Sequence, residues 1–318
     1  MTPSEQPRVV ALGGGHGLAA TLSALRRVTT ALTGIVTVAD NGGSSGRLRR
    51  EFGILPPGDL RMALAALCGD DDWGRAWAEI LQHRFPGDGE LAGHAVGNLL
   101  LAALWDMEGD QVSGLDLVAE LLRAQGRVLP MSRVPLDIEA DVVDRSGAVT
   151  VVRGQEEVAT TAGRILAVRL DPSDPPACGP AVAALDAADW VTIGPGSWFT
   201  SVMPTLLVPE LRQALVRTRA RRVLVLNLAG QPGETDHLTP AEHLDVLAEH
   251  APELHLDVVI ADVRNAADPA ALEKAAGALG ADLVTADIRA AGHDDQHDPV
   301  ALAAVFARTF AAAVDGRA

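Results

Sequence analysis

Four glycine-rich segments, each directly after a short apolar run, constrain the fold of this chain more than any other feature. They are Gly13–Gly17, Asp40–Gly46, Gly194–Ser197 and Asn227–Asp236. In an open parallel α/β sheet, the loops that follow the strands all lie at the same edge. Glycine lets backbone N–H groups approach a ligand closely, and a helix that begins after the loop adds its positive end. The sequence therefore predicts one composite site for a phosphate or diphosphate.

The order of the apolar segments predicts a Rossmann-like α/β fold. Short apolar runs alternate with alanine-rich stretches of helical periodicity, which is typical of a parallel sheet covered by helices. We expect strands at 8–12, 34–39, 165–170, 190–193, 222–227, 256–261 and 282–285, and helices at 18–27, 178–187, 200–218, 240–249, 268–277 and 298–314. Right-handed crossovers would place the strands in one mostly parallel sheet with helices on both faces.

Two stretches depart from this alternation. Helical segments at about 59–68, 73–84, 94–107 and 113–124 predict a helical insertion over about residues 59–125. Alternating apolar residues from 130 to 152, with a turn at Asp144–Gly147, predict a small β-hairpin appendage over about 130–153. We therefore expect residues 1–318 to form a single α/β domain with these two additions.

Composition excludes several classes of protein. The longest apolar stretch, Leu99–Trp105, is far shorter than the roughly 20 residues of a membrane span. A net charge of −16 and 3% aromatic residues argue against nucleic-acid binding, which needs basic stripes and stacking platforms. The N-terminus lacks the pattern of an export signal, and Cys68 and Cys178 are the only cysteines. We expect a cytoplasmic protein with no zinc, no haem, and no membrane or nucleic-acid partner.

The first glycine segment raises the hypothesis of a nicotinamide enzyme. Gly15–Ala20 matches G-x-G-x-x-A, and Asp40 lies where such enzymes carry the acid that binds the ribose. A tight turn from strand to helix explains the same match. A nicotinamide enzyme has no reason to follow that acid with Asn41–Gly46, and the chain has no tyrosine for the Tyr/Lys pair of short-chain dehydrogenases. We expect no NAD.

The second glycine segment predicts a further anion cradle. Ser44 and Ser45 offer hydroxyls and Arg47 offers charge, although a flexible turn followed by a capped helix is the structural alternative. Asp59 is either the N-cap of the next helix or, together with Asp40, a ligand of Mg²⁺ that keeps most of its waters. Arg61 would then balance the charge near the phosphates.

The remaining candidates lie further along the chain. His94 and Asn98 share a face of a buried helix, where either backbone groups or a ligand must satisfy them. Gly196 and Ser197 are placed to donate backbone N–H groups to an anion. The segment with Gln231, Glu234 and Thr235 suits the hydroxyls of a ribose or sugar, and a solvent-exposed acidic turn is the alternative. Near the C-terminus, His293, Asp295 and His297 have the residue types of a metal cluster but not its structural support, so we expect no site there.

Taken in order, these motifs resemble one known family. The match rests on Gly13–Leu18, Thr37–Arg49, Leu55–Arg61, Gly93–Leu101, Ile193–Ser197 and Gln231–Asp236. The chain resembles the gluconeogenesis-factor (YvcK-like) family, which is similar in turn to the CofD-like 2-phospho-lactate transferases. The resemblance implies a cytoplasmic bacterial protein needed for normal growth and cell shape on gluconeogenic carbon sources. It implies a UDP-sugar ligand such as UDP-N-acetylglucosamine.

The family motifs identify the candidate residues and an alternative function. The alternative is a Mg²⁺-dependent transferase that moves a phospho-lactyl or phosphoenolpyruvyl group from a guanosine diphosphate donor to a deazaflavin precursor, with Asp40 and Asp59 as catalytic and metal-binding residues. Many relatives carry threonine in place of His16 and aspartate in place of Asn41, which weakens the catalytic reading. The candidate ligand-binding residues are Gly14, Gly15, His16, Gly17, Asn41, Gly42, Gly43, Ser44, Ser45, Arg47, Arg61, Asn98, Gly196, Ser197, Gln231, Glu234 and Thr235. A nucleotide-diphosphate ligand is the expected partner, and a homodimer is compatible with the sequence.

Overall fold

Seven parallel strands form the central sheet of the computed structural model, which describes residues 6–265 and 268–315. The sheet runs in the order β10-β9-β8-β7-β1-β2-β3, and every pair of neighbours is parallel. The strands are β1 (Val9–Gly13), β2 (Leu32–Val36), β3 (Arg127–Pro130), β7 (Trp190–Ile193), β8 (Arg221–Val225), β9 (Val258–Asp262) and β10 (Asp282–Ala286). All residues of β1, β7 and β9 are buried, which explains why these segments read as continuous apolar runs.

The strand order reverses direction between β1 and β7. From β1 the chain proceeds outward through β2 to β3, whereas from β7 it proceeds the other way through β8 and β9 to β10. In open α/β sheets, ligands bind in the crevice outside the carboxyl ends of the strands at such a reversal. The topology therefore indicates a site at the carboxyl ends of β1 and β7.

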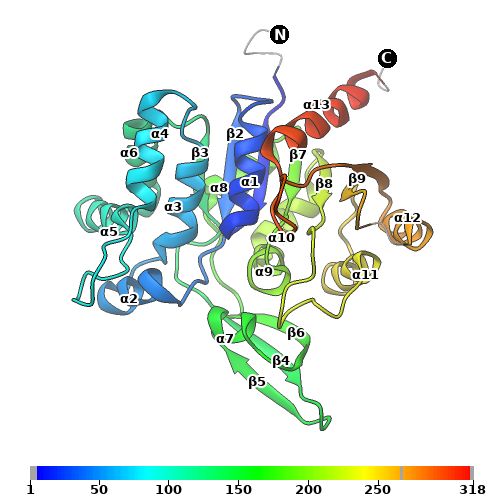
Figure 1. Cartoon of the computed structure of the whole chain (residues 1–318), viewed down its shortest axis with the longest axis horizontal. Helices are drawn as coiled ribbons and strands as arrows, with labels where there is room; N and C mark the ends of the chain where they lie inside the picture. The colour runs from blue at the N-terminus through cyan, green and yellow to red at the C-terminus, as the bar shows by residue number, and fades with distance from the viewer. Residues whose placement is uncertain (1–5, 266–267, 316–318) are drawn as a thin grey trace.

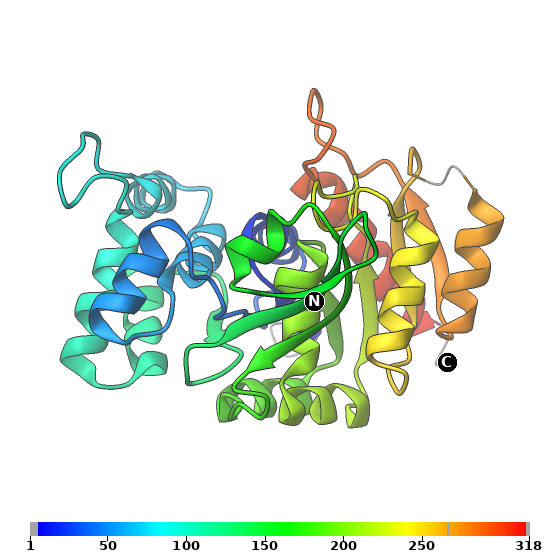
Figure 2. The ribbon, with the colours of Figure 1, turned by 90° about the horizontal axis from the view of Figure 1, so that it is seen from below.

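Helices cover both faces of this sheet, as predicted. On the nearer face in Figure 1 lie α1 (Gly15–Leu25), α3 (Pro57–Ala66) and α13 (Pro299–Asp315), and α1 packs against both of the others. Behind the sheet, α8 (Gly179–Ala187) packs against α10 (Pro209–Arg217). Figure 2 shows these two groups from below, with the strands between them. Two further helices, α11 (Pro240–His250) and α12 (Pro269–Ala278), pack against each other beside β8 to β10.

The helix-rich region separates β2 from β3. It contains α2 (Gly43–Phe52), α3, α4 (Asp72–Gln82), α5 (Val96–Glu108) and α6 (Gln111–Leu122). The α3 helix contacts α1 and β2 on one side and α4 and α5 on the other, so it joins the group of helices at the left of Figure 1 to the sheet. The sequence pattern missed β3, because its four residues directly follow the helices and precede the predicted hairpin.

The predicted hairpin is present and belongs to a three-stranded antiparallel sheet. Its strands are β4 (Asp137–Val143) and β5 (Val149–Arg153), and β6 (Arg164–Asp171) pairs with the other edge of β4. The prediction that 165–170 joins the main parallel sheet was wrong. Along β4 burial alternates strictly, and β6 pairs with it in antiparallel register, which gives the period of a sheet with one buried face. Arg169 on β6 donates to Glu139 on β4 across this ladder, at 2.9 Å.

A single helix predicted over 200–218 is divided into three. A π-helical turn at Trp198–Val202 leads into α9 (Met203–Leu207), and α10 starts again at Pro209. Pro204 and Pro209 lack the N–H group that a continuous helix needs at their positions. The first turn thereby becomes wider, with the Met203 N–H bonded to the Trp198 carbonyl. This turn begins directly after the third glycine segment, beside the crevice.

No helix within residues 6–265 and 268–315 combines the length and the apolar character that crossing a membrane requires.

Candidate functional site

Three of the four glycine-rich loops line one cavity of about 780 Å³ at the carboxyl ends of β1, β7 and β8. The loop after β1 contributes Gly14–Gly17, the loop after β7 contributes Pro195–Ser197, and the loop after β8 contributes Asn227–Pro232 and Glu234. The first and last of these segments are more than 200 residues apart in the chain, yet β1, β7 and β8 are neighbours in the sheet. The cavity therefore lies where the strand order reverses.

The N-terminus of α1 forms one wall of this cavity. The helix begins at Gly15, three residues before the predicted start, and its N-cap residue, Gly14, makes no side-chain hydrogen bond. The first helical turn keeps free backbone N–H groups there, which favours an anion. The His16 side chain is exposed at the cavity. A Cβ on Gly17 would lie 2.3 Å from the Pro195 carbonyl oxygen, so α1 packs directly on the third loop.

The second glycine-rich loop lines an adjoining cavity of about 360 Å³ together with Asp40 and Asp59. The two cavities share four wall residues, Gly15, Ala159, Ser197 and Ser201. The α2 helix begins at Gly43 without a side-chain cap, so a second free helix N-terminus faces this cavity. The four loops thus surround two neighbouring cavities at one edge of the sheet.

Asp40 is close enough to Asp59 to affect its ionisation. Burial, and then the charge of Asp40, raise the pKa of Asp59 to about 7, although the Gly15 N–H and the Arg61 guanidinium act in the opposite direction. Asp59 is not the N-cap of α3, because Pro56 holds that position and Asp59 lies in the first turn. Asp59 instead accepts from the Gly15 N–H at the start of α1.

The surroundings of the two carboxylates are compatible with a divalent cation. A Cβ on Gly14 would lie 2.6 Å from Oδ2 of Asp59, and one on Gly58 would lie 3.0 Å from Oδ2 of Asp40, so glycine leaves the space that the carboxylates occupy. In the described part of the chain no three His, Cys, Asp or Glu side chains are grouped to hold a metal. Two carboxylates with water ligands are the donor set that suits Mg²⁺.

Several candidate residues point into the protein rather than into a cavity. The Ser44 hydroxyl lies 3.0 Å from Nδ1 of His94 and accepts from the Asn98 amide at 2.9 Å. The Ser45 hydroxyl accepts from the Gly58 N–H at 3.0 Å. These bonds connect α2 to α5 and α3, so Ser44, Ser45 and Asn98 hold the cavity wall in place. Asn98 Oδ1 is buried and has no partner among the described residues.

The two candidate arginines also stabilise the walls. Arg47 donates to the carbonyl oxygens of Glu90 and Ala92, at 3.2 and 2.6 Å, and so holds the segment before α5. Arg61 is 3% exposed and donates to Gln82. Burial, and the nearby charge of Arg84, lower the pKa of Arg61 to about 10. Its positive charge acts on Asp59 and Asp40 from behind the site.

The third and fourth loops bind each other. Asn227 Oδ1 accepts from the Gly196 N–H at 2.9 Å, and Gln231 Oε1 accepts from the Trp198 N–H at 3.1 Å. Glu234 is 1% exposed and accepts from the Phe199 N–H at 3.1 Å and from the Ser197 hydroxyl. Thr235 is buried as well. The alternative of a solvent-exposed turn therefore does not hold for Glu234 and Thr235, although Asp236 beside them is exposed, and the Glu234 carboxylate contacts the third loop.

Sequence reasoning did not select one wall of the main cavity. Asp295, Gln296 and His297 line it, and burial lowers the pKa of His297 to about 4. Residues 293–297 had been considered only as a metal cluster. Because their segment follows β10, the rule that joined the other loops would also have indicated it. Asn227 lines the cavity as well, but was not selected within the fourth segment.

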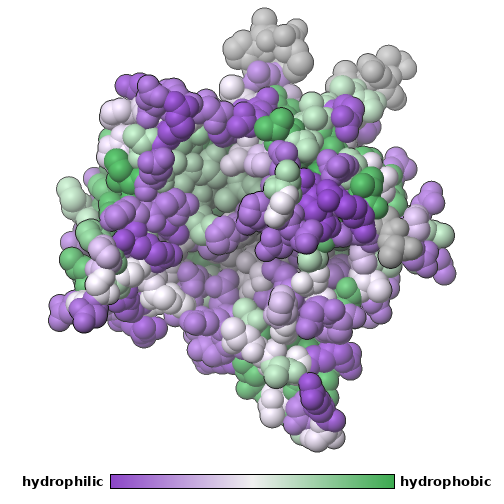
Figure 3. Space-filling view, in the orientation of Figure 1, coloured by the Kyte–Doolittle hydropathy of each residue, from purple (hydrophilic) through white to green (hydrophobic). Residues whose placement is uncertain are grey.

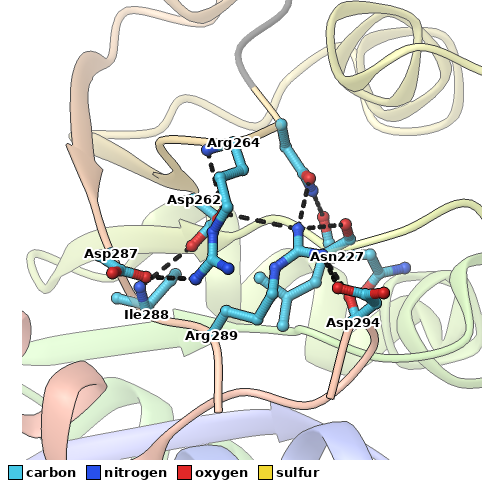
Figure 4. A network of polar contacts seen from close by, with 9 residues as sticks. Asn227, Asp262, Arg264, Asp287, Ile288, Arg289 and Asp294 are labelled. Atoms are coloured by element: carbon cyan, nitrogen blue, oxygen red, sulfur yellow. Dashed lines mark hydrogen bonds and ion pairs between the residues drawn. The ribbon is translucent and has the colours of Figure 1, made fainter. Parts of the chain in front are cut away.

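A polar network holds this wall against the fourth loop (Figure 4). Arg289 donates to the Leu228 carbonyl at 3.0 Å and to Asn265 Oδ1 at 2.7 Å, and its guanidinium lies 3.5 Å from Asp262 Oδ1. Asn265 in turn donates to the Asn227 carbonyl at 2.9 Å. The network thus connects the end of β9 to two walls of the cavity.

The molecular surface around the site is mainly hydrophilic. Figure 3 shows that hydrophilic residues prevail over much of this face, and that weakly apolar residues line a recessed region near its centre. The formal charge of the whole chain is −16, so an anion in the cavity depends on local donors against a repulsive long-range field.

Comparison with known proteins identifies relatives along most of the chain. The model of the family CofD, 2-phospho-L-lactate transferase CofD, matches residues 9–301. A protein of Mycobacterium leprae named "Putative gluconeogenesis factor" is 52% identical over 309 residues, which cover 95% of this chain and 86% of that protein. One of the same name from Mycobacterium tuberculosis strain H37Rv is 53% identical over 303 residues, with 93% and 88% covered. A crystal structure of a Bacillus halodurans protein superposes with a TM-score of 0.85 at 33% identity, covering 95% of this chain and 99% of that one.

Proposed function

The chain belongs to the CofD family and, within it, to the gluconeogenesis factors, and from this premise we propose that it is a regulatory protein that binds a nucleotide sugar. The ligand would be a UDP-sugar such as UDP-N-acetylglucosamine. Its bound state would connect the supply of carbon to synthesis of the cell envelope, so that the protein supports growth and cell shape on gluconeogenic carbon sources.

The observation that carries this proposal is the large cavity at the reversal of the strand order. Its volume of about 780 Å³ lies within the range of small-molecule sites and leaves room for a nucleoside and a sugar. The uncapped N-termini of α1 and α2 offer backbone donors to the diphosphate at the junction of the two cavities. His16 and Asp295, from opposite ends of the chain, supply polar groups at the wall.

Isothermal titration calorimetry with UDP-N-acetylglucosamine tests the proposal. We expect saturable heat below millimolar ligand, weaker binding of UDP, and weaker binding still of free N-acetylglucosamine. The absence of heat at millimolar ligand would contradict the proposal. Native mass spectrometry of freshly purified protein provides an independent test, because a retained small molecule reveals the ligand class and the same spectrum separates monomer from homodimer.

The proposal also places the protein in the cytoplasm. Cys68 and Cys178 are both free and buried, and burial raises the pKa of the Cys68 thiol to about 11. Such thiols are inert, as is typical of structural cysteines in a reducing compartment. A reporter fused to this chain without an added export signal should stay in the cytoplasm. Its export to the periplasm would contradict this placement.

The two neighbouring carboxylates favour a second candidate function, a Mg²⁺-dependent transferase. Asp40 and Asp59 would hold the cation, which would neutralise the diphosphate and the leaving group of a guanosine diphosphate donor. The acceptor would be a deazaflavin precursor. The chain's own part is to position the donor on the helix N-termini and to hold the two carboxylates next to each other, where a bound cation would favour the ionised form of Asp59.

An activity assay separates this candidate from the regulatory one. We expect product from a guanosine-diphospho-lactate donor and a deazaflavin acceptor, Mg²⁺ dependence, and loss of at least 100-fold in rate in Asp59→Asn, as expected when a metal ligand that stabilises transferred charge is removed. Asp137→Asn is the matched control, because that carboxylate pairs with Arg49 at 2.7 Å, away from the cavity. Unchanged activity in Asp59→Asn would remove the assignment of the metal.

A further inference from the structure

A carboxylate of the chain itself occupies the place where the third loop was expected to bind an anion. Glu234 reaches from the fourth loop to the start of the π-helical turn at Trp198–Val202. Its Oε2 accepts from the Phe199 N–H at 3.1 Å, and its Oε1 accepts from the Ser197 hydroxyl. The Thr200 hydroxyl lies 2.8 Å from the same oxygen.

The donors around Glu234 are those that a phosphate at this position would use. They are one backbone N–H at the start of a helical turn and two hydroxyls on the same turn. Gln231 occupies the adjacent backbone donor, the Trp198 N–H, at 3.1 Å. The Glu234 carboxylate is thus held by hydrogen bonds from the Ser197 and Thr200 hydroxyls and the Phe199 N–H, at the positive end of the turn.

We propose that Glu234 is an internal anion. It occupies the group of donors formed by Ser197, Phe199 and Thr200, called here the third-loop nest, and it fixes the third and fourth loops to each other as one wall. Glu234 lines the main cavity, but its carboxylate is bonded to the third loop, so it is a positioning residue that acts through that loop. The consequence for the ligand rests on the proposed function: the diphosphate is excluded from the N–H groups of Trp198 and Phe199 and is directed to the N-termini of α1 and α2. The specificity of the site then depends on a wall that the chain completes before any ligand arrives.

The fourth loop is built to hold this position. Gln231 N–H is bonded to the Thr235 hydroxyl at 3.0 Å, and the N–H groups of residues 234–236 all bond to the Gln231 carbonyl. Gly233 has a φ of +82° and would bring a Cβ within 2.9 Å of the Thr161 carbonyl oxygen, so a side chain there is excluded. These restraints fix the direction in which Glu234 leaves the backbone.

Chemical rescue tests the inference. In Glu234→Ala the nest is empty, and we expect the melting temperature to fall by roughly 5 °C because buried donors lose their acceptor. Formate at about 200 mM should restore most of this loss, whereas chloride at equal ionic strength should not. Glu249→Gln, an exposed glutamate on α11, is the control and should match the unchanged protein in both salts. An unchanged melting temperature in Glu234→Ala, or an equal formate effect on the control, would overturn the inference.

Glu234→Gln provides a second test that does not depend on an emptied core. The amide fills the nest, so formate should have no effect, but its NH₂ group opposes a donor of the third loop. We expect faster hydrogen exchange in 196–201 and in 227–236 together, and unchanged exchange in 9–13. UDP-N-acetylglucosamine should bind roughly tenfold more weakly, because the wall is less ordered. Faster exchange in 227–236 alone would show that Glu234 does not hold the third loop.

The two tests separate this inference from the proposed function. If the unchanged protein does not bind a UDP-sugar, the proposed function fails, while formate rescue of Glu234→Ala still establishes the internal anion. If the unchanged protein binds and Glu234→Gln binds with equal affinity and unchanged exchange, the inference fails and the proposed function stands.

Discussion

At the scale of single residues, the site depends on what surrounds each carboxylate. Asp59 and Glu234 were both selected from the sequence as polar groups at loop ends. In the structure, Asp59 faces a cavity beside another carboxylate, whereas Glu234 is enclosed by donors from the third loop. The same carboxylate group therefore has two roles. In Asp59 it is compatible with a cation, and in Glu234 it takes the place of an anion. Only the partners brought by tertiary contacts distinguish them.

The raised pKa of Asp59 predicts how stability depends on pH. Because its pKa of about 7 in the folded protein lies above the ordinary 3.8, the folded state binds more protons than the unfolded chain between these values. The free energy of unfolding should therefore fall as the pH rises from about 4 to about 7, by an amount on the order of 2 kcal/mol after allowance for solvent screening. Urea unfolding at several pH values without Mg²⁺ measures it.

Asp59→Asn is the control for this pH dependence. The amide does not ionise, so the variant should lack this part of the slope, and the difference between the two proteins isolates Asp59 from other titrating groups. Added Mg²⁺ at pH 7.5 should stabilise the unchanged protein and not the variant. Equal slopes in both proteins would show that Asp59 ionises at an ordinary pH.

Asn41 gives a second prediction at this scale. Its amide donates to Glu157 at 2.8 Å, and its oxygen accepts from the Glu156 N–H at 3.0 Å, so it holds α7 (Gln155–Ala159) against the second loop. Asn41→Asp should lower the free energy of unfolding by about 1 kcal/mol, because the lost donor leaves two carboxylates opposed. The double variant Asn41→Asp with Glu157→Gln should regain most of it, since the new amide can donate. Additive losses in a double-mutant cycle would contradict this pairing.

At the scale of elements, the position of α1 decides how close the first and third loops come. Sequence periodicity placed the start of this helix at residue 18, whereas it begins within the glycine segment at Gly15. The glycines are thus part of the first helical turn and allow it to touch the third loop. The α9 and α10 helices show the opposite effect, because prolines interrupt a stretch whose apolar periodicity is continuous.

Gly17→Ala tests the contact between α1 and the third loop. The new Cβ would lie 2.3 Å from the Pro195 carbonyl oxygen and 2.7 Å from the Gly196 Cα, so backbone must move. We expect UDP-N-acetylglucosamine affinity to fall at least tenfold and the free energy of unfolding to fall by roughly 1–3 kcal/mol, as for overpacking of a core.

Gly277→Ala on α12 is the matched control, because no heavy atom lies within 4 Å of its added Cβ. It should leave binding unchanged and stabilise the protein by roughly 0.5–1 kcal/mol through helix propensity. Calorimetry and urea unfolding measure both variants. Equal ligand affinity in Gly17→Ala and the unchanged protein would show that the contact does not shape the cavity.

At the scale of the whole molecule, the strand order and the network around Arg289 bring both halves of the chain to one cavity. The α3 helix contacts the sheet and the neighbouring helices alike, which supports our proposal that residues 1–318 are one domain. The small antiparallel sheet and α7 reach the same edge, because Asn41 bonds α7 and Gln155 donates to the Thr200 carbonyl at 2.8 Å. The α7 helix, which follows the predicted hairpin, therefore also contributes to the site.

The charge of −16 gives a prediction for ligand association. A negative field opposes the approach of a nucleotide diphosphate, and salt screens this field over roughly 10 Å at 0.1 M. The association rate for UDP-N-acetylglucosamine should therefore rise severalfold between about 20 and 200 mM KCl. Stopped-flow measurements with a fluorescent analogue determine the rate, and uncharged N-acetylglucosamine serves as the control ligand. A falling rate would indicate a locally positive entrance.

The sequence by itself determined the inner strands of the main sheet and the place of the loops that follow them. Apolar runs followed by glycine mark β1, β7 and β8. Buried parallel strands need the apolar residues, and tight loops near a ligand need the glycines. The sequence did not determine which sheet β6 joins, because its pattern of apolar residues suits either sheet. Only its pairing with β4 places it in the small antiparallel sheet.

The tertiary structure alone decided which side chains reach the cavity. Ser44, Arg47 and Glu234 carry groups that suit a ligand. In the structure, however, Ser44 is bonded to α5, Arg47 to the segment before α5, and Glu234 to the third loop. Hydrogen bonds join whichever donors and acceptors the packed elements bring within about 3 Å, and that proximity is not written in the local sequence.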